Sequence, residues 1–332
     1  NQLSLSGLGK TWPNPIVGAV LLDSEGAFIS EGFHRHGENG QPGQHAEIVA
    51  INSAGGRAKG STLIVTLEPC NHSGKTPPCT DAIIAAGITE VHFGISDPHV
   101  LASGGEAKLR AAGIKVSSGI LKDEIEITNR AWIHKIKIGR PLITAKIAAT
   151  HDGFVAAYDG SSQWITSTPA RADVAQLRRN TDAIVTGTGT VLADNPRLTA
   201  RPSNHQPVRI VLGNREIPRD AQIFNEEAPT KIISSRNLQD FLSFCQEEGF
   251  NQVLLEAGPT LVSAFLEADL VDEIFLYQAP TLLGNGKSFA GDLKITSLHQ
   301  RLDFMISDTA TVGEGIEKNL RTHLRRREKV GS

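Results

Sequence analysis

The chain has few cysteines, few aromatic residues and almost no net charge. Three cysteines among 332 residues are too few for a disulfide framework. A formal charge of −3 and an aromatic content of 5% provide neither the basic surface nor the stacking platform typical of nucleic-acid-binding proteins. We therefore expect a small-molecule partner rather than a nucleic acid.

Long apolar runs are also missing. No stretch approaches the roughly 20 apolar residues that a membrane-spanning helix needs, and no charged-then-apolar signal segment opens the chain. These absences predict a soluble, cytoplasmic protein. Because Met305 is the only methionine, we also expect the native N-terminus to extend beyond the sequence shown.

The length suits two α/β domains, each with a core of its own. In the first, apolar and β-branched runs predict strands at 16–22, 26–33, 62–67 and 91–95, and helical spacing predicts helices at 45–54 and 79–86. Gly139-Arg140-Pro141 interrupts the pattern, which restarts as a strand at 142–148. We therefore predict domains at residues 1–139 and 140–332.

The second domain repeats the alternation of strands and helices. Its further strands are predicted at 183–186, 208–212, 231–234, 252–256 and 273–279. Cys245 lies in a helical pattern and is expected to be a buried thiol. The Arg- and Lys-rich run at 321–329 is typical of a solvated, frayed end.

His45-Ala46-Glu47, followed by Pro69-Cys70 and Pro78-Cys79, is the pattern that carries chemistry. One histidine and two cysteines can hold one zinc ion and leave its fourth position to water. Both segments begin where helices begin, and the positive end of a helix favours thiolate over thiol. Glu47 can move protons beside the metal, which predicts a hydrolytic deaminase with Glu47 as its catalytic residue.

A closed structural zinc site is the alternative. It would need a fourth ligand, for instance His36 or His72, and it would leave Glu47 without a role. Structural sites typically gather cysteines in tight pairs, whereas eight residues separate Cys70 from Cys79. The spacing also differs from the P-C-x-x-C signature of most nucleobase deaminases.

The long insert identifies a family resemblance. Residues 11–20 (TWPNPIVGAV), 45–47 (HAE) and 66–79 (TLEPCNHSGKTPPC) resemble the bifunctional riboflavin-biosynthesis deaminase/reductases of bacteria. The resemblance implies a cytidine-deaminase-like α/β/α domain in which Asn14 contacts the pyrimidine. It also implies that the insert residues His72, Lys75 and Thr76 hold the substrate and its ribose phosphate.

The loop at 97–105 departs from the family pattern. The family usually carries Asp-Pro-Asn-Pro followed by Val-Ala-Gly, a basic residue and Gly, whereas this chain reads DPHVLASGG. A basic residue is therefore absent beside the predicted deaminase site.

Two glycine-rich strand ends mark a second site. Gly187-Thr188-Gly189 is only a partial dinucleotide fingerprint, because no third glycine follows and Pro196 arrives early, so a standard Rossmann domain is disfavoured. Gly258-Pro259 ends a buried strand and opens a helix. Backbone N–H groups at such ends can approach a phosphate.

The segment 254–260 (LLEAGPT), together with 142–146 (LITAK), 152–153 (DG), 162–166 (SQWIT) and 193–199 (ADNPRLT), resembles the reductase domain of the same family, whose α/β fold is similar to dihydrofolate reductase. The resemblance implies NADPH as cofactor, facing Ala148, Trp164, Thr190, Asp194, Gly258, Pro259, Thr260, Leu261, Val262, Ser263 and Ala264. It implies that the sugar-phosphate substrate faces Lys146, Ser162, Arg178, Leu198, Arg201 and Glu256. Where the family often shows an aspartate after the third strand, this chain has Gly213-Asn214.

The sequence thus predicts two successive reactions in riboflavin biosynthesis. Zinc-dependent deamination of a diamino-ribosylamino-pyrimidinone 5′-phosphate is followed by NADPH-dependent reduction of its ribosyl group to ribityl. One alternative is a nucleoside or nucleic-acid deaminase whose C-terminal half is a binding module. Another is an inert interaction protein with structural zinc. Homo-oligomerisation is implied by the resemblance alone.

Overall fold

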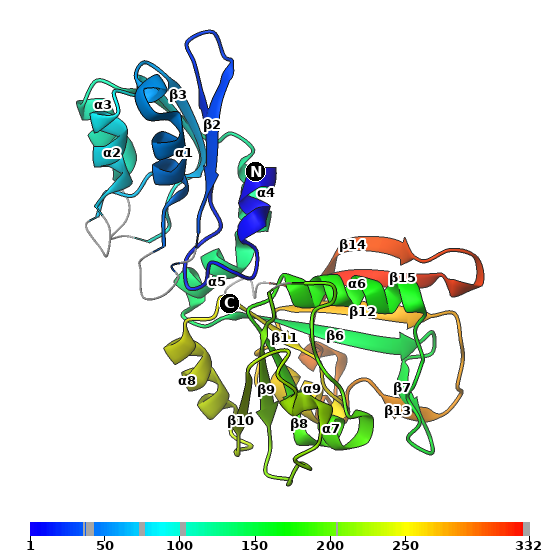
Figure 1. Ribbon diagram of the computed structural model, residues 1–332. Coiled ribbons are helices and arrows are strands. Elements are labelled where there is room, and N and C mark those ends of the chain that lie inside the picture. Colours follow the sequence, from blue (N-terminus) through cyan, green and yellow to red (C-terminus); the bar gives the residue numbers. More distant parts are fainter. Residues whose placement is uncertain (36, 38–42, 73–76, 100–103, 204, 328–332) are drawn as a thin grey trace. The chain divides into compact units, whose positions relative to one another are not determined.

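The structure is a computed structural model that describes residues 1–332 except 36, 38–42, 73–76, 100–103, 204 and 328–332 (Figure 1). The chain divides into two compact units, Asn1–Arg140 and Pro141–Ser332. The division falls at the peptide that joins Arg140 to Pro141. Each unit is built around a β-sheet of its own.

The first unit contains a five-stranded sheet in the order β2-β1-β3-β4-β5. β1 pairs antiparallel with β2 and β3, whereas β3, β4 and β5 run parallel. The strands span β1 (Gly18–Leu22), β2 (Phe28–Phe33), β3 (Thr62–Leu67), β4 (Glu90–Ile95) and β5 (Lys115–Ser118). The predicted hairpin and the strand at 62–67 are confirmed.

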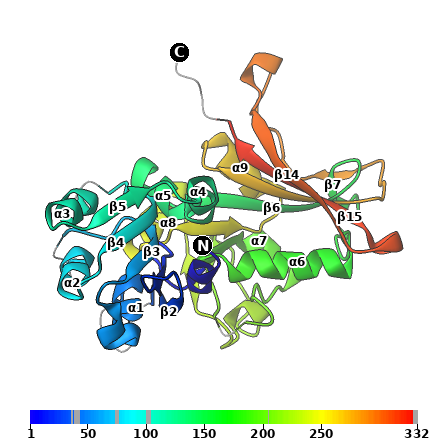
Figure 2. The ribbon, with the colours of Figure 1, turned by 90° about the horizontal axis from the view of Figure 1, so that it is seen from above.

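Helices cover both faces of this sheet, which makes the first unit an α/β/α sandwich. α1, α2 and α3 lie on one face, and α4 and α5 lie on the other (Figure 1; Figure 2). The helices span α1 (Ala46–Ala54), α2 (Cys79–Ala85), α3 (Gly105–Ala111), α4 (Lys122–Thr128) and α5 (Arg130–Ile138). Leu21, Leu63, Ile83 and Phe93 are fully buried between the layers.

The second unit contains an eight-stranded sheet in the order β10-β9-β8-β11-β6-β12-β15-β14. The first six strands in this order run parallel, and β15 and β14 are antiparallel additions at one end. A two-stranded sheet pairs β13 with β7. The parallel strands span β6 (Leu142–Thr150), β8 (Ala183–Gly187), β9 (Val208–Leu212), β10 (Thr230–Ile233), β11 (Gln252–Leu255) and β12 (Glu273–Ala279), and the others span β7 (Phe154–Ala157), β13 (Gly286–Ser288), β14 (Phe304–Val312) and β15 (Asn319–Arg326).

Among the described residues of this unit, four α-helices accompany the sheet: α6 (Thr168–Arg179), α7 (Thr188–Asp194), α8 (Leu238–Glu248) and α9 (Pro259–Glu267). α9 starts with Pro259 directly after Gly258, as the sequence predicts. The buried thiol predicted for Cys245 is confirmed, since this residue of α8 is 0% exposed.

The predicted frayed end is wrong for residues 321–326. They belong to β15, which lies between β12 and β14. Their arginines have partners in the folded unit: Arg321 pairs with Asp173 at 3.1 Å, and Arg325 pairs with Glu273 at 3.4 Å. A run of basic residues thus becomes a strand because distant acidic residues compensate its charge. Lys329 lies outside the described residues.

None of the helices in the described part of the chain is long and apolar enough to cross a membrane.

Candidate active sites

The three predicted zinc ligands lie at or near the ends of helices and strands. His45 precedes α1 with an extended backbone, Cys70 follows β3, and Cys79 is the first residue of α2. β3 is a buried strand, so the chain that leaves it is held in place up to Cys70. Cys70 lies after the end of β3 and before the start of α2. Of the two cysteines, only Cys79 lies on a helix.

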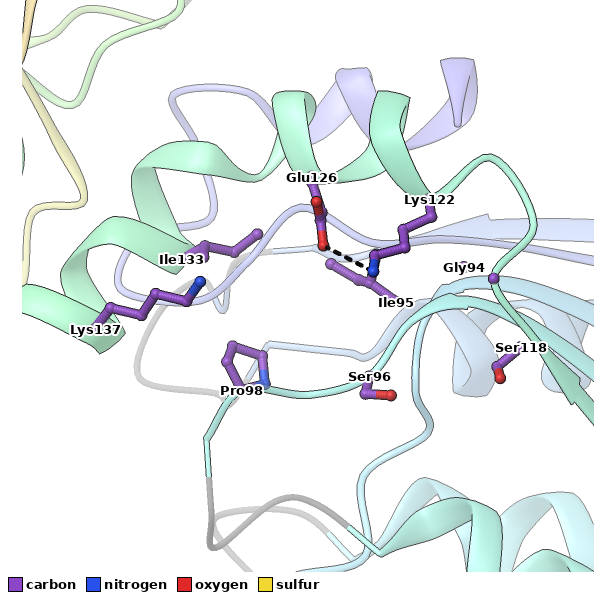
Figure 3. Close-up of a pocket in the computed structure, with 10 residues that line it drawn as sticks. Gly94, Ile95, Ser96, Pro98, Ser118, Lys122, Glu126, Ile133 and Lys137 are labelled. Carbon is purple, nitrogen blue, oxygen red and sulfur yellow. Dashed lines mark ion pairs between the residues drawn. The ribbon is translucent and has the colours of Figure 1, made fainter. Parts of the chain in front are cut away.

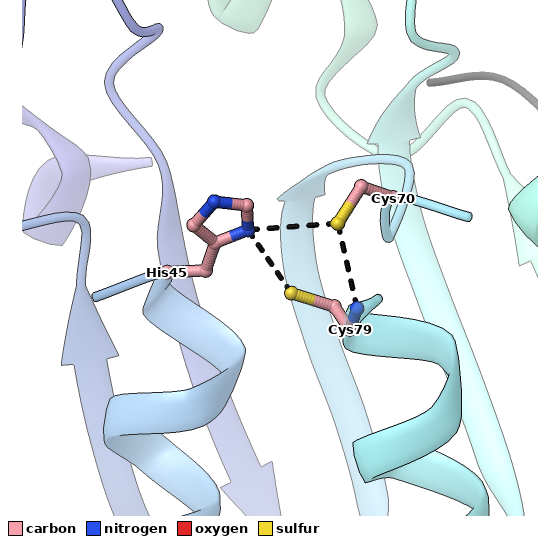
Figure 4. Close-up of side chains that lie close together, drawn as sticks. All are labelled: His45, Cys70 and Cys79. Atoms are coloured by element: carbon pink, nitrogen blue, oxygen red, sulfur yellow. Dashed lines mark hydrogen bonds between the residues drawn. The ribbon is translucent and has the colours of Figure 1, made fainter. Parts of the chain in front are cut away.

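The ligand atoms face one another (Figure 4). His45 Nδ1 lies 3.1 Å from Cys79 Sγ and 3.6 Å from Cys70 Sγ. Usual zinc bond lengths place a nitrogen and a sulfur ligand of one tetrahedral ion about 3.6 Å apart. The three ligand atoms all lie within 4.8 Å of one another, so this set fits a zinc ion.

The electrostatics suit metal capture. The pKa of the Cys70 thiol is lowered to about 4, because Cys79 and then His45 donate hydrogen bonds to its sulfur. Thiolate is the form that binds metal. Glu47 lies on the first turn of α1, 4% exposed, and burial raises the pKa of its carboxyl group.

Within the described part of the chain, the candidate metal group holds three residues and no fourth ligand. His72 is exposed and is not part of it. His36, the other fourth ligand considered for a structural site, lies outside the described residues. A three-ligand set leaves a coordination position open, which is the arrangement of catalytic rather than structural zinc sites.

Asn14 also reaches this site. Its Nδ2 lies 3.3 Å from His34 Nε2, and the His34 ring packs edge-on against the His45 ring with centroids 5.5 Å apart. His34 is a buried residue that the sequence analysis missed, although its place one residue after β2 could have indicated it. Lys75 and Thr76 lie outside the described residues.

Glu68 is a second residue that the sequence analysis missed. Its buried carboxylate accepts hydrogen bonds from the backbone N–H groups of Asp97, at 3.2 Å, and Glu106, at 3.0 Å. It thereby ties the segment before Cys70 to the chain that follows β4 and to the start of α3. A carboxylate directly before Pro69-Cys70 is the sequence signal that could have found it.

The second unit has a cavity of about 1150 Å³ at the carboxyl ends of its parallel strands. Sixteen of the predicted reductase residues line it: Lys146, Ala148, Ser162, Trp164, Arg178, Thr190, Asp194, Leu198, Arg201, Glu256, Gly258, Pro259, Thr260, Leu261, Val262 and Ala264. Ser263 is placed differently. It is buried on α9, and its Oγ accepts a hydrogen bond from the Gly291 N–H at 2.6 Å.

Glu256 is the buried centre of a charge cluster in this cavity. Arg178 donates two hydrogen bonds to its carboxylate, at 2.5 and 2.9 Å, and Lys146 Nζ lies 3.2 Å away. Burial raises the pKa of Glu256, but the charges of Arg178 and Lys146 outweigh burial and lower it to about 2. The cluster keeps an ionised carboxylate and two cations at fixed positions.

The lining carries far more positive than negative charge. Its basic residues are Lys146, Arg171, Arg178, Arg197, Arg201, Arg215, Arg236 and Lys287, against the carboxylates of Asp194 and Glu256. Such a cavity fits ligands with several phosphate groups. The sequence analysis missed five of these cations, although a basic residue a few positions after a predicted strand is a usable signal for Arg215 and Arg236.

A smaller cavity of about 330 Å³ lies in the first unit, between the ends of β4 and β5 and helices α4 and α5 (Figure 3). Lys122, which lies 3.9 Å from Glu126, and Lys137 contribute to its lining. None of the three predicted zinc ligands lines it, and neither does Glu47.

Two family descriptions match successive parts of the chain. "Cytidine and deoxycytidylate deaminase zinc-binding region" matches residues 3–95, and "RibD C-terminal domain" matches residues 141–317. The chain belongs to the RibD family. The α/β fold and the riboflavin-biosynthesis family predicted from the sequence are confirmed.

Relatives within the RibD family match most of the chain. The riboflavin biosynthesis protein RibD of Mycobacterium tuberculosis is 42% identical over 311 residues, 92% of this chain and 90% of that protein. That of Escherichia coli is 39% identical over 322 residues, 86% of each chain. The crystal structure of a diaminohydroxyphosphoribosylaminopyrimidine deaminase/5-amino-6-(5-phosphoribosylamino)uracil reductase from Thermotoga maritima superposes with a TM-score of 0.87 at 33% identity, over 98% of this chain and 96% of that one.

The function follows from this membership. The chain is a bifunctional enzyme of riboflavin biosynthesis with a deaminase and a reductase activity. Its deaminase part contains a zinc-binding region, and its reductase part implies a nicotinamide cofactor. The alternative function required a binding module in the C-terminal half, and the RibD C-terminal domain matches that part of the chain instead.

Proposed function

We propose that residues 1–139 deaminate 2,5-diamino-6-ribosylamino-4(3H)-pyrimidinone 5′-phosphate and that residues 140–332 then reduce the ribosyl group of the product to ribityl with NADPH. The observation that carries this proposal is that one chain holds both an open His-Cys-Cys ligand set and a large cation-lined cavity. The T. maritima neighbour is named for a deaminase and a reductase that act on successive phosphoribosylamino-pyrimidines, which supports the order.

In the deaminase, His45, Cys70 and Cys79 would hold one zinc ion, which when bound activates a water molecule for attack on C2 of the pyrimidine. Glu47 takes a proton from that water and passes it to a ring nitrogen and then to the departing ammonia. Asn14 orients the pyrimidine. His72, Lys75 and Thr76 hold the substrate and its ribose phosphate.

In the reductase, NADPH when bound would supply a hydride to C1′ of the ribose, while the ring C1′–O bond breaks and the ring oxygen takes up a proton to become a hydroxyl group. Ala148, Trp164, Thr190, Asp194 and the segment 258–264 would hold the cofactor. Within that segment the Ser263 hydroxyl is bonded to the Gly291 N–H, so this side chain is not assigned a cofactor contact. The sugar phosphate lies against Lys146, Ser162, Arg178, Leu198, Arg201 and Glu256, where planar arginine forks suit a phosphate.

The test measures the deamination and the reduction separately. The zinc-loaded chain is given the diamino-pyrimidine, ammonia release is assayed, and NADPH oxidation is followed by its absorbance. We expect NADPH oxidation from this substrate only after ammonia is released. Glu47→Gln should block both signals, and the deaminated pyrimidine should restore NADPH oxidation in that variant. An enzyme that releases no ammonia, or that leaves NADPH unoxidised with the deaminated product, contradicts the proposal.

A cytoplasmic location and homo-oligomeric assembly stay predictions from the sequence.

A further inference from the structure

Asn129 links helices α4 and α5 to the segment that precedes β1. It is 3% exposed and lies between Thr128, the last residue of α4, and Arg130, the first residue of α5. Its Oδ1 accepts a hydrogen bond from the Ile16 N–H at 3.0 Å, and its Nδ2 donates one to the Ile16 carbonyl at 3.1 Å. The side chain thus pairs with both polar backbone groups of a residue 113 positions away.

The side-chain amide of Asn129 is not used to cap the helix that follows it. An asparagine directly before a helix typically accepts a hydrogen bond from the first turn of that helix. Asn129 makes no such side-chain bond to α5. Its backbone N–H donates to the Ile125 carbonyl of α4, and its carbonyl accepts from the Ile133 N–H of α5. Backbone bonds to both helices therefore fix this residue, while its side chain is directed to Ile16.

The segment that this amide holds carries Asn14. Asn14 lies between two prolines, which have no backbone N–H group, so the backbone donors of residues 13–16 are those of Asn14 and Ile16. The first closes a local turn with the Thr11 carbonyl at 2.9 Å. The second donates to Asn129 Oδ1. Loss of the Asn129 amide would therefore remove the backbone bond that joins this segment to the α4–α5 junction.

Asn14 is the residue of this segment that reaches the deaminase site. Its side chain is exposed, and its Nδ2 lies 3.3 Å from His34 Nε2. The His34 ring in turn packs against the ring of the predicted zinc ligand His45. Because Asn14 lies only two residues before Ile16, the position of the Ile16 backbone decides where the Asn14 amide lies relative to this ligand.

We propose that Asn129 is a positioning residue of the deaminase, which holds the Ile16 backbone so that Asn14 meets the pyrimidine in a fixed orientation. The task requires a donor and an acceptor side by side, which the amide of an asparagine supplies. A contact that is equally strong in the ground state and the transition state lowers KM and leaves kcat unchanged. This inference rests on the proposed deamination and on the role of Asn14 in it.

The first experiment measures KM and kcat for ammonia release by the full-length, zinc-loaded chain with the diamino-pyrimidine. We expect Asn129→Ala to raise KM by roughly tenfold or more, because two hydrogen bonds are lost, and to change kcat by less than about threefold. Asn129→Asp keeps the size and the acceptor but, as a carboxylate, loses the donor, so its KM should rise as well. Both variants should retain one zinc ion per chain and oxidise NADPH normally with the deaminated pyrimidine.

Thr128→Val is the matched control. Thr128 lies next to Asn129 at the same junction, but its Oγ1 donates to the Glu124 carbonyl at 2.6 Å and accepts from Asn1 Nδ2 at 3.3 Å. Its KM should equal that of the wild type. Circular dichroism checks that each variant is folded. An unchanged KM in both Asn129 variants, an equal rise in the Thr128 variant, or loss of the fold or of the zinc in both Asn129 variants would overturn the inference.

The second experiment is a double-mutant cycle that tests whether Asn129 acts through Asn14. Asn14→Ala should raise KM, and adding Asn129→Ala to that variant should have little further effect. Independent, additive effects would show that Asn129 stabilises the fold without positioning Asn14, and would overturn the inference.

The cycle also separates this inference from the function on which it rests. If the wild type releases no ammonia, the proposed deaminase function itself fails. If the wild type releases ammonia but Asn14→Ala leaves KM unchanged, the deaminase stands and the positioning role of Asn129 fails.

Discussion

Glu47 and Glu256 are buried carboxyl groups in opposite electrostatic surroundings. Burial raises the pKa of Glu47, which supports a residue that accepts and returns a proton. Burial also raises the pKa of Glu256, but the two cations beside it lower the value to about 2. Glu256 therefore stays ionised at neutral pH and acts as a fixed charge that positions Arg178 and Lys146.

Replacing Glu47 with glutamine keeps the shape of the side chain and removes its proton transfer. We expect Glu47→Gln to lower the rate of ammonia release by about 10²- to 10⁴-fold while one zinc ion per chain is retained. Rate assays and metal analysis measure the two effects. Glu25→Gln, an exposed carboxylate in the β1–β2 turn, is the control and should change neither. Loss of the zinc together with the rate would make Glu47 a structural residue instead.

The Glu256 cluster should give the second unit a pH-dependent stability. The ordinary pKa of this group is 4.5 and the folded value is about 2, so protons bind the unfolded form more readily. Its stabilising contribution is therefore complete above about pH 4.5 and is lost as the pH falls toward 2.

Calorimetric melting of the wild type and Glu256→Gln between pH 3 and pH 7 tests this. At pH 7 the variant should lose about 3 kcal/mol, since the partly buried cations Arg178 and Lys146 lose their shared partner. The difference between the two proteins should shrink below about pH 4.5. A difference that does not change with pH would contradict the ionised state of Glu256.

At the scale of elements, the position of α1 against β2 decides where His45 and Glu47 lie. Gly32 of β2 faces this helix: a Cβ there would overlap the Ala46 carbonyl oxygen and come within 2.7 Å of the Ala50 nitrogen. The absence of a side chain at Gly32 is what lets the first turn of α1 approach the sheet.

Gly32→Ala should push α1 away from β2. We expect a loss of about 1–3 kcal/mol in the stability of the first unit, together with weaker zinc binding and slower ammonia release. NADPH oxidation with the deaminated product should be unchanged. Gly56→Ala is the control, because a Cβ at that position meets no atom within 4 Å. Equal effects of the two substitutions would show that the close approach is unimportant.

At the scale of the whole molecule, the two sites belong to different units. The three predicted zinc ligands lie within Asn1–Arg140, and the residues that line the large cavity lie within Pro141–Ser332. Each site is supported by a sheet of its own, so the chemistry of one does not require the ligands of the other.

Zinc removal should therefore separate the two activities. After treatment with a chelator, we expect ammonia release to stop and NADPH oxidation with the deaminated pyrimidine to continue at an unchanged rate. Added zinc should restore the first activity. A parallel loss of both activities would mean that the metal also supports the second unit.

Local patterns in the sequence were sufficient to predict much of the fold and of the first site. The β-branched run at 62–67 is β3, and the Gly258-Pro259 pair opens α9. His45, Glu47, Cys70 and Cys79 are recognisable because residue type and spacing in one short stretch already define a zinc ligand set. Capping, periodicity and ligand spacing are properties of neighbouring residues, so the sequence alone determined them.

Only the tertiary structure decided which distant residues meet. The Glu256–Arg178 pair joins positions 78 residues apart, and Asp173 reaches Arg321 across 148 residues. The same cause made a predicted frayed end into β15 and aligned the ends of β9 and β10, where Leu212 pairs with Ile233. Strand order and register depend on the packing of the whole sheet, and no local pattern records them.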